Sequence, residues 1–477
     1  MKRSTCVSLS GLIGLILGLW VFPSAEGAEQ APARVRLTVD ATAAPRPALR
    51  YTLLHEIIDQ TPGNAALVYQ RVRGLLAQNE RWSEQSEQCE KWLKLPIEEL
   101  PVDAVEALVS QHASTLGQLV KATRCERCDW EIPIRQDGVN ALLPHLSEVR
   151  TAARLLALEI RLHARQGRYP EAMDRLKAGF ALTRHVGNGT MLIEGLVGVA
   201  IANMMLDRLE ELVRQPGAPN LYWALSDLPP GFLNLWHATR WERCFVYVHL
   251  PVLWEARTGP VTAADLRRSV IEMQKIVGGG NPWPGLPDEE RAALMTTAGA
   301  LLAYPRAIEY LKSQGRSAEE IAKTPVAEAL VAYVGGAFAV QRDNLFKWFA
   351  LPYPQAQPGL ARAELELQEA RKNDPIGSIL PGLVLPALSR AANRYAALER
   401  RVALLRCVEA IRNDVAAHGG RLPAALDDIQ EMPIPLDPMT GKPFVYRLDG
   451  KTAILEGPAA PGQDAKSSRT YEITIRP

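Results

Sequence analysis

The sequence lacks an excess of charge of either sign. It contains 54 Lys and Arg residues against 53 Asp and Glu residues, and the two signs alternate along the chain rather than cluster. Proteins that bind nucleic acid carry a basic surface that neutralises phosphates. We therefore predict that nucleic acid is not a partner of this chain.

The motifs of several enzyme classes are missing too. The sequence has no Gly-x-Ser-x-Gly nucleophile elbow, no phosphate-binding loop and no dinucleotide fingerprint. Residues 55–59, which read His-Glu-Ile-Ile-Asp, depart from the zinc-protease helix motif because they lack its second His. We therefore predict no catalytic residue, no cofactor and no metal ligand, with a hydrolase of unrecognised type as an alternative.

Cysteine is scarce, and one close pair stands out: Cys125 and Cys128, separated by Glu and Arg. A four-ligand zinc site needs a second pair of Cys or His residues at similar spacing, which the sequence lacks. Haem attachment needs a His where the chain has Asp129. Three alternatives stay open, namely a local disulfide, two free thiols and a redox pair, and we favour the disulfide.

Several ionisable side chains that could form an acid–base group fall within one stretch of predicted helices. They are His145, Glu148, His163, His185 and Glu194. Folding could bring some of them together. A His or Glu on an apolar helical face is more often a hydrogen-bonded residue of the core, and we favour that structural role.

Long apolar runs are absent except near the N-terminus. There Lys2 and Arg3 precede the apolar residues 7–22 and the mostly small residues 23–28. This order is typical of a secretory signal peptide, which we predict to span residues 1–27, with an uncleaved anchor as the alternative. We expect an exported protein, periplasmic or extracellular. The apolar residues 191–206 are too few to cross a membrane, so we expect no transmembrane span after signal removal.

The rest of the chain is mainly helical by its apolar periodicity. We predict an irregular body of helical hairpins, resembling an α-solenoid, followed by a small C-terminal α+β module with a long helix and a three-stranded antiparallel sheet. We predict a linker at 28–49, helical segments at 50–228 and 229–387, and the C-terminal module at 388–477. The alternating residues 35–39 of the linker indicate an isolated edge strand, with an extended leader as the alternative.

Residues 146–163 and 169–183 predict a pair of antiparallel helices. The turn between them resembles the middle of a tetratricopeptide repeat, on the residues Ala164, Gly167, Tyr169, Glu171, Ala172 and Leu176. This resemblance covers one hairpin and implies a protein-binding surface of stacked helices. A generic helix pair is the alternative.

The C-terminal segment resembles type II secretion pseudopilins over about 60 residues. The residues that carry the resemblance are Gly420, Pro423, Leu426, Asp437, Pro438, Gly441, Pro443 and Tyr446. We expect Asp437 to cap the turn that Pro438 begins, and Gly441 to adopt positive φ. The resemblance implies a component of secretion or envelope machinery, although residues 1–27 lack the processing site of a pilin.

Three short sequence motifs, at 59–66, 128–130 and 437–443, are similar to motifs of large exported bacterial helical proteins of uncharacterised activity. Together with the helical hairpin, they favour an exported scaffold or protein-binding module of the cell envelope. We expect its partners to be proteins of the envelope.

Overall fold

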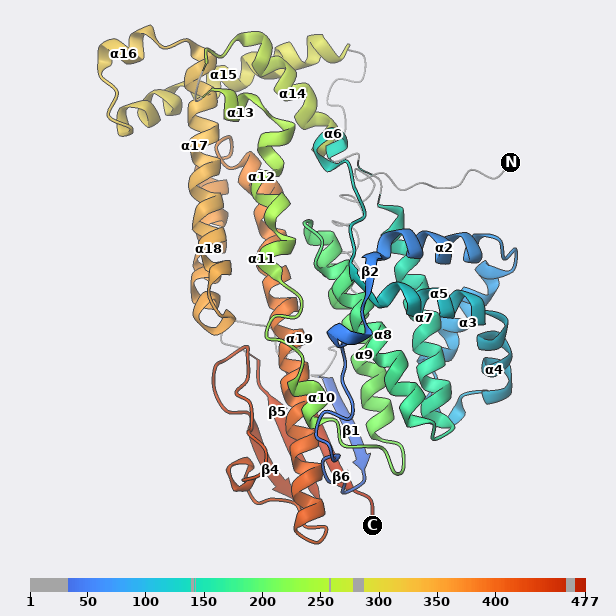
Figure 1. Cartoon of the computed structure of the whole chain (residues 1–477). Helices are drawn as coiled ribbons and strands as arrows, with labels where there is room; N and C mark the ends of the chain where they lie inside the picture. Colours follow the sequence, from blue (N-terminus) through green and yellow to red (C-terminus); the bar gives the residue numbers. More distant parts are fainter. Residues whose placement is uncertain (1–32, 139–140, 142, 257–258, 278–286, 460–467) are drawn as a thin grey trace. The chain divides into compact units, whose positions relative to one another are not determined.

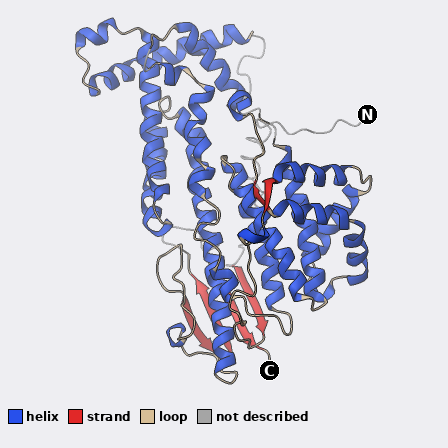
Figure 2. Cartoon of the chain, viewed as in Figure 1, coloured by secondary structure: helices blue, strands red, loops and turns tan. Residues whose placement is uncertain are grey.

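The computed structural model describes residues 33–138, 141, 143–256, 259–277, 287–459 and 468–477. The predicted signal peptide, residues 1–27, lies outside this set. Helices make up 65% of the structure, with 18 α-helices among the described residues. The mainly helical prediction is therefore confirmed, and Figure 2 shows how little of the chain is strand.

The chain forms two compact units, each built from separated segments. The described part of unit 1 comes from Glu131–Leu143 and Thr239–Ala392. The described part of unit 2 comes from residues 33–130, 144–238, 393–459 and 468–477. The α-helices of unit 1 are α6 (Ile134–Asp137), α12 (Arg240–His249), α13 (Val252–Glu255), α14 (Ala263–Val277), α15 (Asp288–Ser313), α16 (Ala318–Lys323), α17 (Val326–Phe346) and α18 (Tyr353–Asn373), with the start of α19 (Ile379–Ala417).

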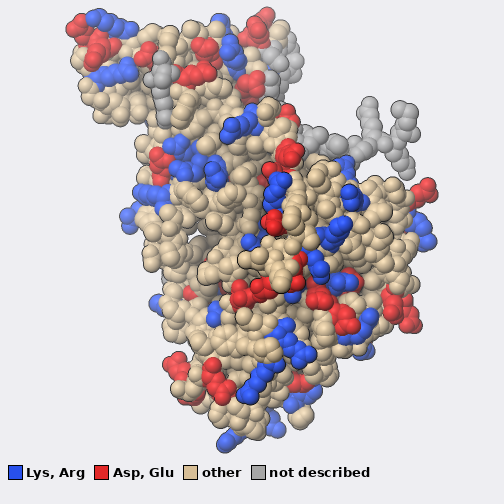
Figure 3. Space-filling model, in the orientation of Figure 1, with Lys and Arg blue, Asp and Glu red and all other residues tan. Residues whose placement is uncertain are grey.

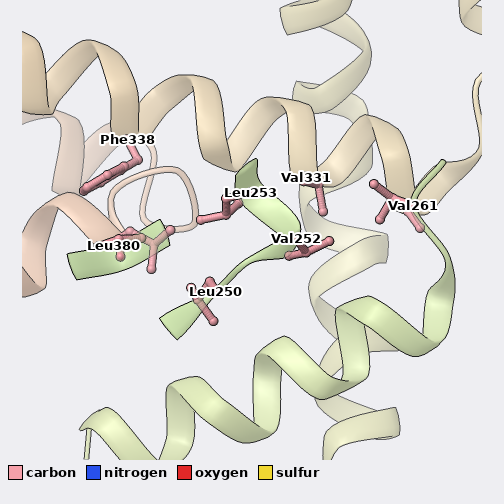
Figure 4. Close-up of a cluster of buried hydrophobic side chains, with 9 residues drawn as sticks. Leu250, Val252, Leu253, Val261, Val331, Phe338 and Leu380 are labelled. Carbon is pink, nitrogen blue, oxygen red and sulfur yellow. The ribbon is translucent and has the colours of Figure 1, made fainter. Parts of the chain in front are cut away.

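A cluster of buried aliphatic and aromatic side chains holds part of unit 1 together. It joins Leu250 and α13 to α17 and to Leu380 at the start of α19, and Figure 4 shows these side chains facing one another. Phe338 of α17 belongs to this cluster and is fully buried. Burial of such residues stabilises a fold by roughly 1.5–3 kcal/mol each.

Unit 2 holds two sheets and the remaining helices (Figure 1). Its α-helices, besides the end of α19, are α2 (Ala65–Ala77), α3 (Trp82–Lys94), α4 (Val102–Gln111), α5 (Ala113–Thr123), α7 (Pro144–Arg165), α8 (Tyr169–Gly187), α9 (Leu192–Val213), α10 (Tyr222–Ser226) and α11 (Leu235–Ala238). Its strands are β1 (Ala33–Val39), β2 (Thr61–Asn64), β3 (Cys125–Arg127), β4 (Val445–Asp449), β5 (Thr452–Gly457) and β6 (Arg469–Ile475). The predicted hairpin is the pair α7 and α8, and Gly167 turns the chain between them with a φ of 70°.

The prediction of a three-stranded antiparallel sheet at the C-terminus is wrong in one respect. The sheet has four strands in the order β1-β6-β5-β4, and β1 lies parallel to β6. The added strand comes from the predicted linker, where alternation buries Leu37 and Val39 on the covered face. Sequence alternation identifies such a strand but not its partner, because the two strands are far apart along the chain.

Helix α19 continues from unit 1 into unit 2. Between positions 400 and 415 every side chain is buried except Val402 and Arg406, which are half-buried. Buried charges on this helix therefore need partners. Arg400 donates to both carboxylate oxygens of Asp437 at 2.8 and 2.7 Å, and Arg401 donates to Glu210 at 2.9 Å.

The predicted turn at Asp437 is confirmed. Its Oδ1 accepts from the backbone N–H of Met439 at 2.9 Å, and Gly441 has a φ of 68°. Asp437 thus shapes the turn and also binds Arg400. Two glycines with positive φ, Gly419 and Gly420, follow the end of α19.

Candidate functional site

A polar pocket of about 240 Å³ lies in unit 2, where the loop before β2 meets β3 and α8. The residues that line it are Leu54, His55, Gln60, Thr123, Cys125, Glu126, Arg127, Cys128, Ala181, Arg184, His185 and Asn188. The loop reaches the pocket because buried Thr52 and Leu53 anchor it just upstream. Figure 1 shows the blue segment that leads into β2 beside α8.

The pairing of β2 with β3 sets the geometry of this pocket. Thr61 lies opposite Cys125 in a parallel register, and the Thr61 N–H donates to the carbonyl of Arg124 at 2.8 Å. At the other end, Asn64 binds the backbone of Asp129. Asn64 also accepts from the N–H of Ala66 and so caps α2. Two of the short sequence motifs, 59–66 and 128–130, are therefore neighbours in the fold.

Two imidazoles face the pocket, and both are electrically neutral near pH 7. Burial, with Lys177 and Arg124 nearby, lowers the pKa of His55 to about 4. Burial likewise lowers the pKa of His185 to about 4. A hydrogen bond to the backbone of Cys125 favours the charged ring and offsets only part of this effect. Neutral imidazole carries one donor and one acceptor nitrogen.

The hydrogen bonds of His185 fix its orientation. Its Nδ1 lies 2.9 Å from the hydroxyl of Tyr69 on α2. Either partner of this bond can donate, according to the tautomer of the ring. His55 lies 3.3 Å from the hydroxyl of Thr123. Both rings are therefore held for hydrogen bonding rather than for proton transfer at neutral pH.

Cys125 and Cys128 are both free cysteines in this structure, Cys125 buried and Cys128 half-buried, and the disulfide favoured from the sequence stays a prediction. Burial, followed by the nearby Glu194 carboxylate, raises the pKa of the Cys128 thiol, which makes it a weak nucleophile.

Behind the pocket, three rings form a continuous stack that the sequence did not reveal. Tyr69 stacks on Trp130 with ring centroids 5.5 Å apart, and Trp130 stacks on His145 at 4.4 Å. These rings come from α2, from the segment after β3 and from α7. Two features of the sequence could have pointed to this stack. Tyr69 shares a helical spacing with Val72 and Leu76, which indicates burial, and Trp130 lies two residues after Cys128.

The structure brings together only some of the five ionisable residues named from the sequence. His145 Nε2 lies 3.6 Å from Glu194 Oε1, and both residues are at least nine-tenths buried. The second oxygen of Glu194 accepts from the N–H of Met191 at the start of α9. Gly189 leaves room for this carboxylate, because a Cβ there would lie 2.2 Å from it.

The other three ionisable residues have separate surroundings. Glu148 binds Arg73 at 2.9 Å. His163 lies 3.7 Å from Glu159, near the other end of α7 and about 27 Å along the helix from His145. His185 reaches His145 only through Tyr69 and Trp130. No single acid–base group contains all five.

The chemistry that this arrangement offers is recognition by hydrogen bonds. The pocket presents imidazole, amide, hydroxyl and guanidinium groups, whereas His145 and Glu194 are buried behind Trp130. Over the described ranges, no three His, Cys, Asp or Glu side chains are placed to hold a metal ion. In that same part of the chain, no helix has both the length and the apolar character of a membrane span.

The chain matches no protein-family profile, no curated protein and no solved structure.

Proposed function

We propose that this chain is an exported binding protein of the cell envelope, and that unit 2 recognises a segment of a partner protein at Ile57, Ile58 and the pocket beside them. The observation that carries this proposal is the exposure of the two adjacent isoleucines, 87% for Ile57 and 91% for Ile58. Single exposed apolar residues are normal on a protein surface. Two in succession, on the tip of a loop whose ends line a pocket, favour a contact site.

The loop that carries the isoleucines is held in one conformation. The side chain of Gln60 donates to the carbonyl of His55 at 3.2 Å, and the backbone N–H of Gln60 donates to the carbonyl of Ile57 at 3.1 Å. These bonds close the loop at its base. A preformed loop loses little conformational entropy on binding, which favours affinity.

The pocket and the isoleucines together suit a peptide segment that has both apolar and polar side chains. Ile57 and Ile58 offer apolar area, and His55, Gln60 and Asn188 offer neutral donors and acceptors. Two basic residues, Arg127 and Arg184, and one acidic residue, Glu126, line the same pocket. Because the positive charge is in excess, one acidic or amide side chain of the partner fits the pocket best. In Figure 3 basic and acidic side chains are interspersed over the visible face, which favours local recognition over binding to a broad charged surface.

Export and scaffolding belong to the same proposal. The N-terminal sequence supports export, and the α7–α8 hairpin, which resembles a tetratricopeptide unit, supports a scaffold built in an α-solenoid-like way. Helices α8 and α9 pack on α7 and provide the rigid support that such a surface needs.

Two alternatives have less support. A hydrolase needs accessible acid–base groups, whereas His145 and Glu194 are buried. Assembly in the manner of a pseudopilin needs a processing site, which residues 1–27 lack.

Site-specific photo-crosslinking in cells tests the proposal. A photoreactive residue at position 58 should form a covalent adduct with one envelope protein, and the substitution Ile57→Ser should reduce that adduct. The matched control is a photoreactive residue at Leu67, which is 61% exposed on α2 in the same unit. Equal adducts at both positions, or none at position 58, would contradict the proposal.

A further inference from the structure

Two arginines line the pocket of unit 2 without a partner in the described part of the chain. Arg127 ends β3 and Arg184 lies in the last turn of α8, and both residues are exposed. No carboxylate or carbonyl of the described residues binds either guanidinium. A guanidinium has five N–H donors and no acceptor. The pocket therefore presents a set of unused donors.

Asn188 adds two more donors to this set. It lies four residues after Arg184, so the two side chains share one face at the end of α8. The Asn188 oxygen accepts from the N–H of Asn234 at 3.4 Å, whereas its NH₂ group has no partner among the described residues. The amide of Gln60, by contrast, already donates to the carbonyl of His55 at 3.2 Å. Unused donors thus outnumber unused acceptors in the lining of the pocket.

The charges around both imidazoles of the pocket are predominantly positive. Burial lowers the pKa of His55 most, and Lys177 and Arg124 lower it further than the nearby carboxylates raise it. Burial also has the largest effect on the pKa of His185, and Arg184 lowers that pKa further with no carboxylate acting against it. The C-terminal ends of α5 and α8 add about half a negative charge each, which is less than the full charges of Arg124 and Arg184 at those ends. A negatively charged group is therefore stabilised beside these rings.

We propose that this pocket binds a carboxylate group of the partner segment, which Arg127 and Arg184 hold by charge-assisted hydrogen bonds. The inference rests on the proposed function and narrows it from an acidic or amide group to a carboxylate. A carboxylate only accepts hydrogen bonds, whereas an amide also needs acceptors for its own N–H groups. The unused donors of the pocket match the carboxylate.

The size and the charge of the pocket match this ligand too. Its volume of about 240 Å³ is below the range of pockets that enclose a whole small-molecule ligand, so one side chain or one chain end fits. Two arginines and Glu126 leave a single positive charge in the lining, since both imidazoles are neutral near pH 7. A carboxylate carries one negative charge, whereas a phosphate carries nearly two. The pocket therefore favours a carboxylate over a phosphate.

Three short probes test the inference on the full chain. Acetylated leucyl-glutamate with a C-terminal amide offers a side-chain carboxylate, acetylated leucyl-leucine offers a C-terminal carboxylate, and acetylated leucyl-glutamine with a C-terminal amide offers none. We expect one of the first two to bind at least about tenfold more tightly than the glutamine probe, which cannot form charge-assisted hydrogen bonds as an acceptor. Saturation-transfer NMR, which observes the probe, measures the three affinities. The tighter of the two carboxylate probes identifies the source of the carboxylate.

Substitution of the two arginines supplies the control for charge. Arg127→Gln and Arg184→Gln should each reduce the affinity for the carboxylate probe to near that for the glutamine probe. The matched control is Arg165→Gln, at an exposed arginine that ends α7, and it should leave the affinity unchanged. The inference is overturned by absent binding of both carboxylate probes, by equal affinity for the carboxylate and glutamine probes, by tighter binding of inorganic phosphate, or by equal losses in all three variants.

Photo-crosslinking at position 58 separates this inference from the proposed function. An adduct that forms in full yield in the Arg184→Gln variant supports the proposed function and overturns the carboxylate. Carboxylate binding that depends on Arg184, without any adduct at position 58, supports the ligand class of the pocket and overturns the partner site at Ile57 and Ile58.

Discussion

Asn64 and Asp129 bind each other through two hydrogen bonds of 2.8 Å, one from the side-chain amide of Asn64 to the carbonyl of Asp129 and one from the N–H of Asp129 to the Asn64 oxygen. The same oxygen caps α2 through Ala66. One amide therefore joins the start of a helix to the segment that carries Cys128 and Trp130, and thus positions one side of the pocket.

Asn64→Ala removes the helix cap and both bonds to Asp129, so we expect it to lower the free energy of unfolding by about 2–3 kcal/mol. Asn64→Asp keeps the acceptor oxygen and loses only the donor, so its cost should be smaller. Urea titrations followed by circular dichroism measure both. A larger cost for Asn64→Asp than for Asn64→Ala would refute this role of the oxygen.

Breaking the buried pair of Arg400 and Asp437 should lower the free energy of unfolding more than Asn64→Ala does. Both side chains are at most 2% exposed, so Asp437→Ala leaves a buried guanidinium without its carboxylate and should cost about 3–5 kcal/mol. The control is Glu319→Ala in the exposed pair with Lys323, which should change stability little. Similar denaturation midpoints for the two variants would show that the buried pair is dispensable.

Leu405 and Arg406 are adjacent in α19 and should differ in the cost of truncation. Leu405 is 1% exposed, so Leu405→Ala should cost about 2–5 kcal/mol. Arg406 is half-buried with its guanidinium 5.5 Å from the ring centre of Tyr222, so Arg406→Ala should cost about 1 kcal/mol. The measurement is a denaturant titration of the full chain, because β1 from the N-terminal region completes the sheet.

Acid should weaken unit 2 through the two pocket imidazoles. The pKa values of His55 and His185 are about 4 in the folded state, against 6.5 as the ordinary value. Between these values the unfolded chain binds more protons than the folded chain. The free energy of unfolding that these two residues contribute is therefore fully present above pH 6.5 and is lost as the pH falls toward 4.

Denaturation midpoints measured at several pH values in this window check that expectation. A variant with His55→Asn and His185→Gln should lose less stability between pH 6.5 and 4 than the unmodified chain. Identical slopes for the two proteins would mean that other groups account for the acid sensitivity.

The thiols should react at very different rates. Among the five described cysteines, Cys244 is exposed and should react first with a maleimide at pH 7. Burial raises the pKa of Cys89 to about 11 and that of Cys407 to about 12, so both should react only after unfolding. Mass spectrometry of labelled peptides gives the order, and early labelling of Cys407 would contradict the packing of α19.

Some features of the fold could be predicted because short stretches of sequence specify them. The apolar spacing of α7 and α8, the turn at Asp437 and the positive φ of Gly441 depend on residues within a few positions of one another. Helical periodicity, capping and positive φ are local properties. For the same reason the sequence indicated strand character at 35–39 without its partner.

The tertiary structure alone decided which distant segments meet. It paired β1 with β6, joined Asn64 to Asp129, and placed Trp130 between Tyr69 and His145. Such contacts depend on how the helices pack around one another, because a side chain's neighbours across the core are fixed by shape and burial and not by its spacing along the chain. The sequence by itself therefore determined the helices and turns of this protein, whereas packing determined its pocket, its four-stranded sheet and its buried ion pairs.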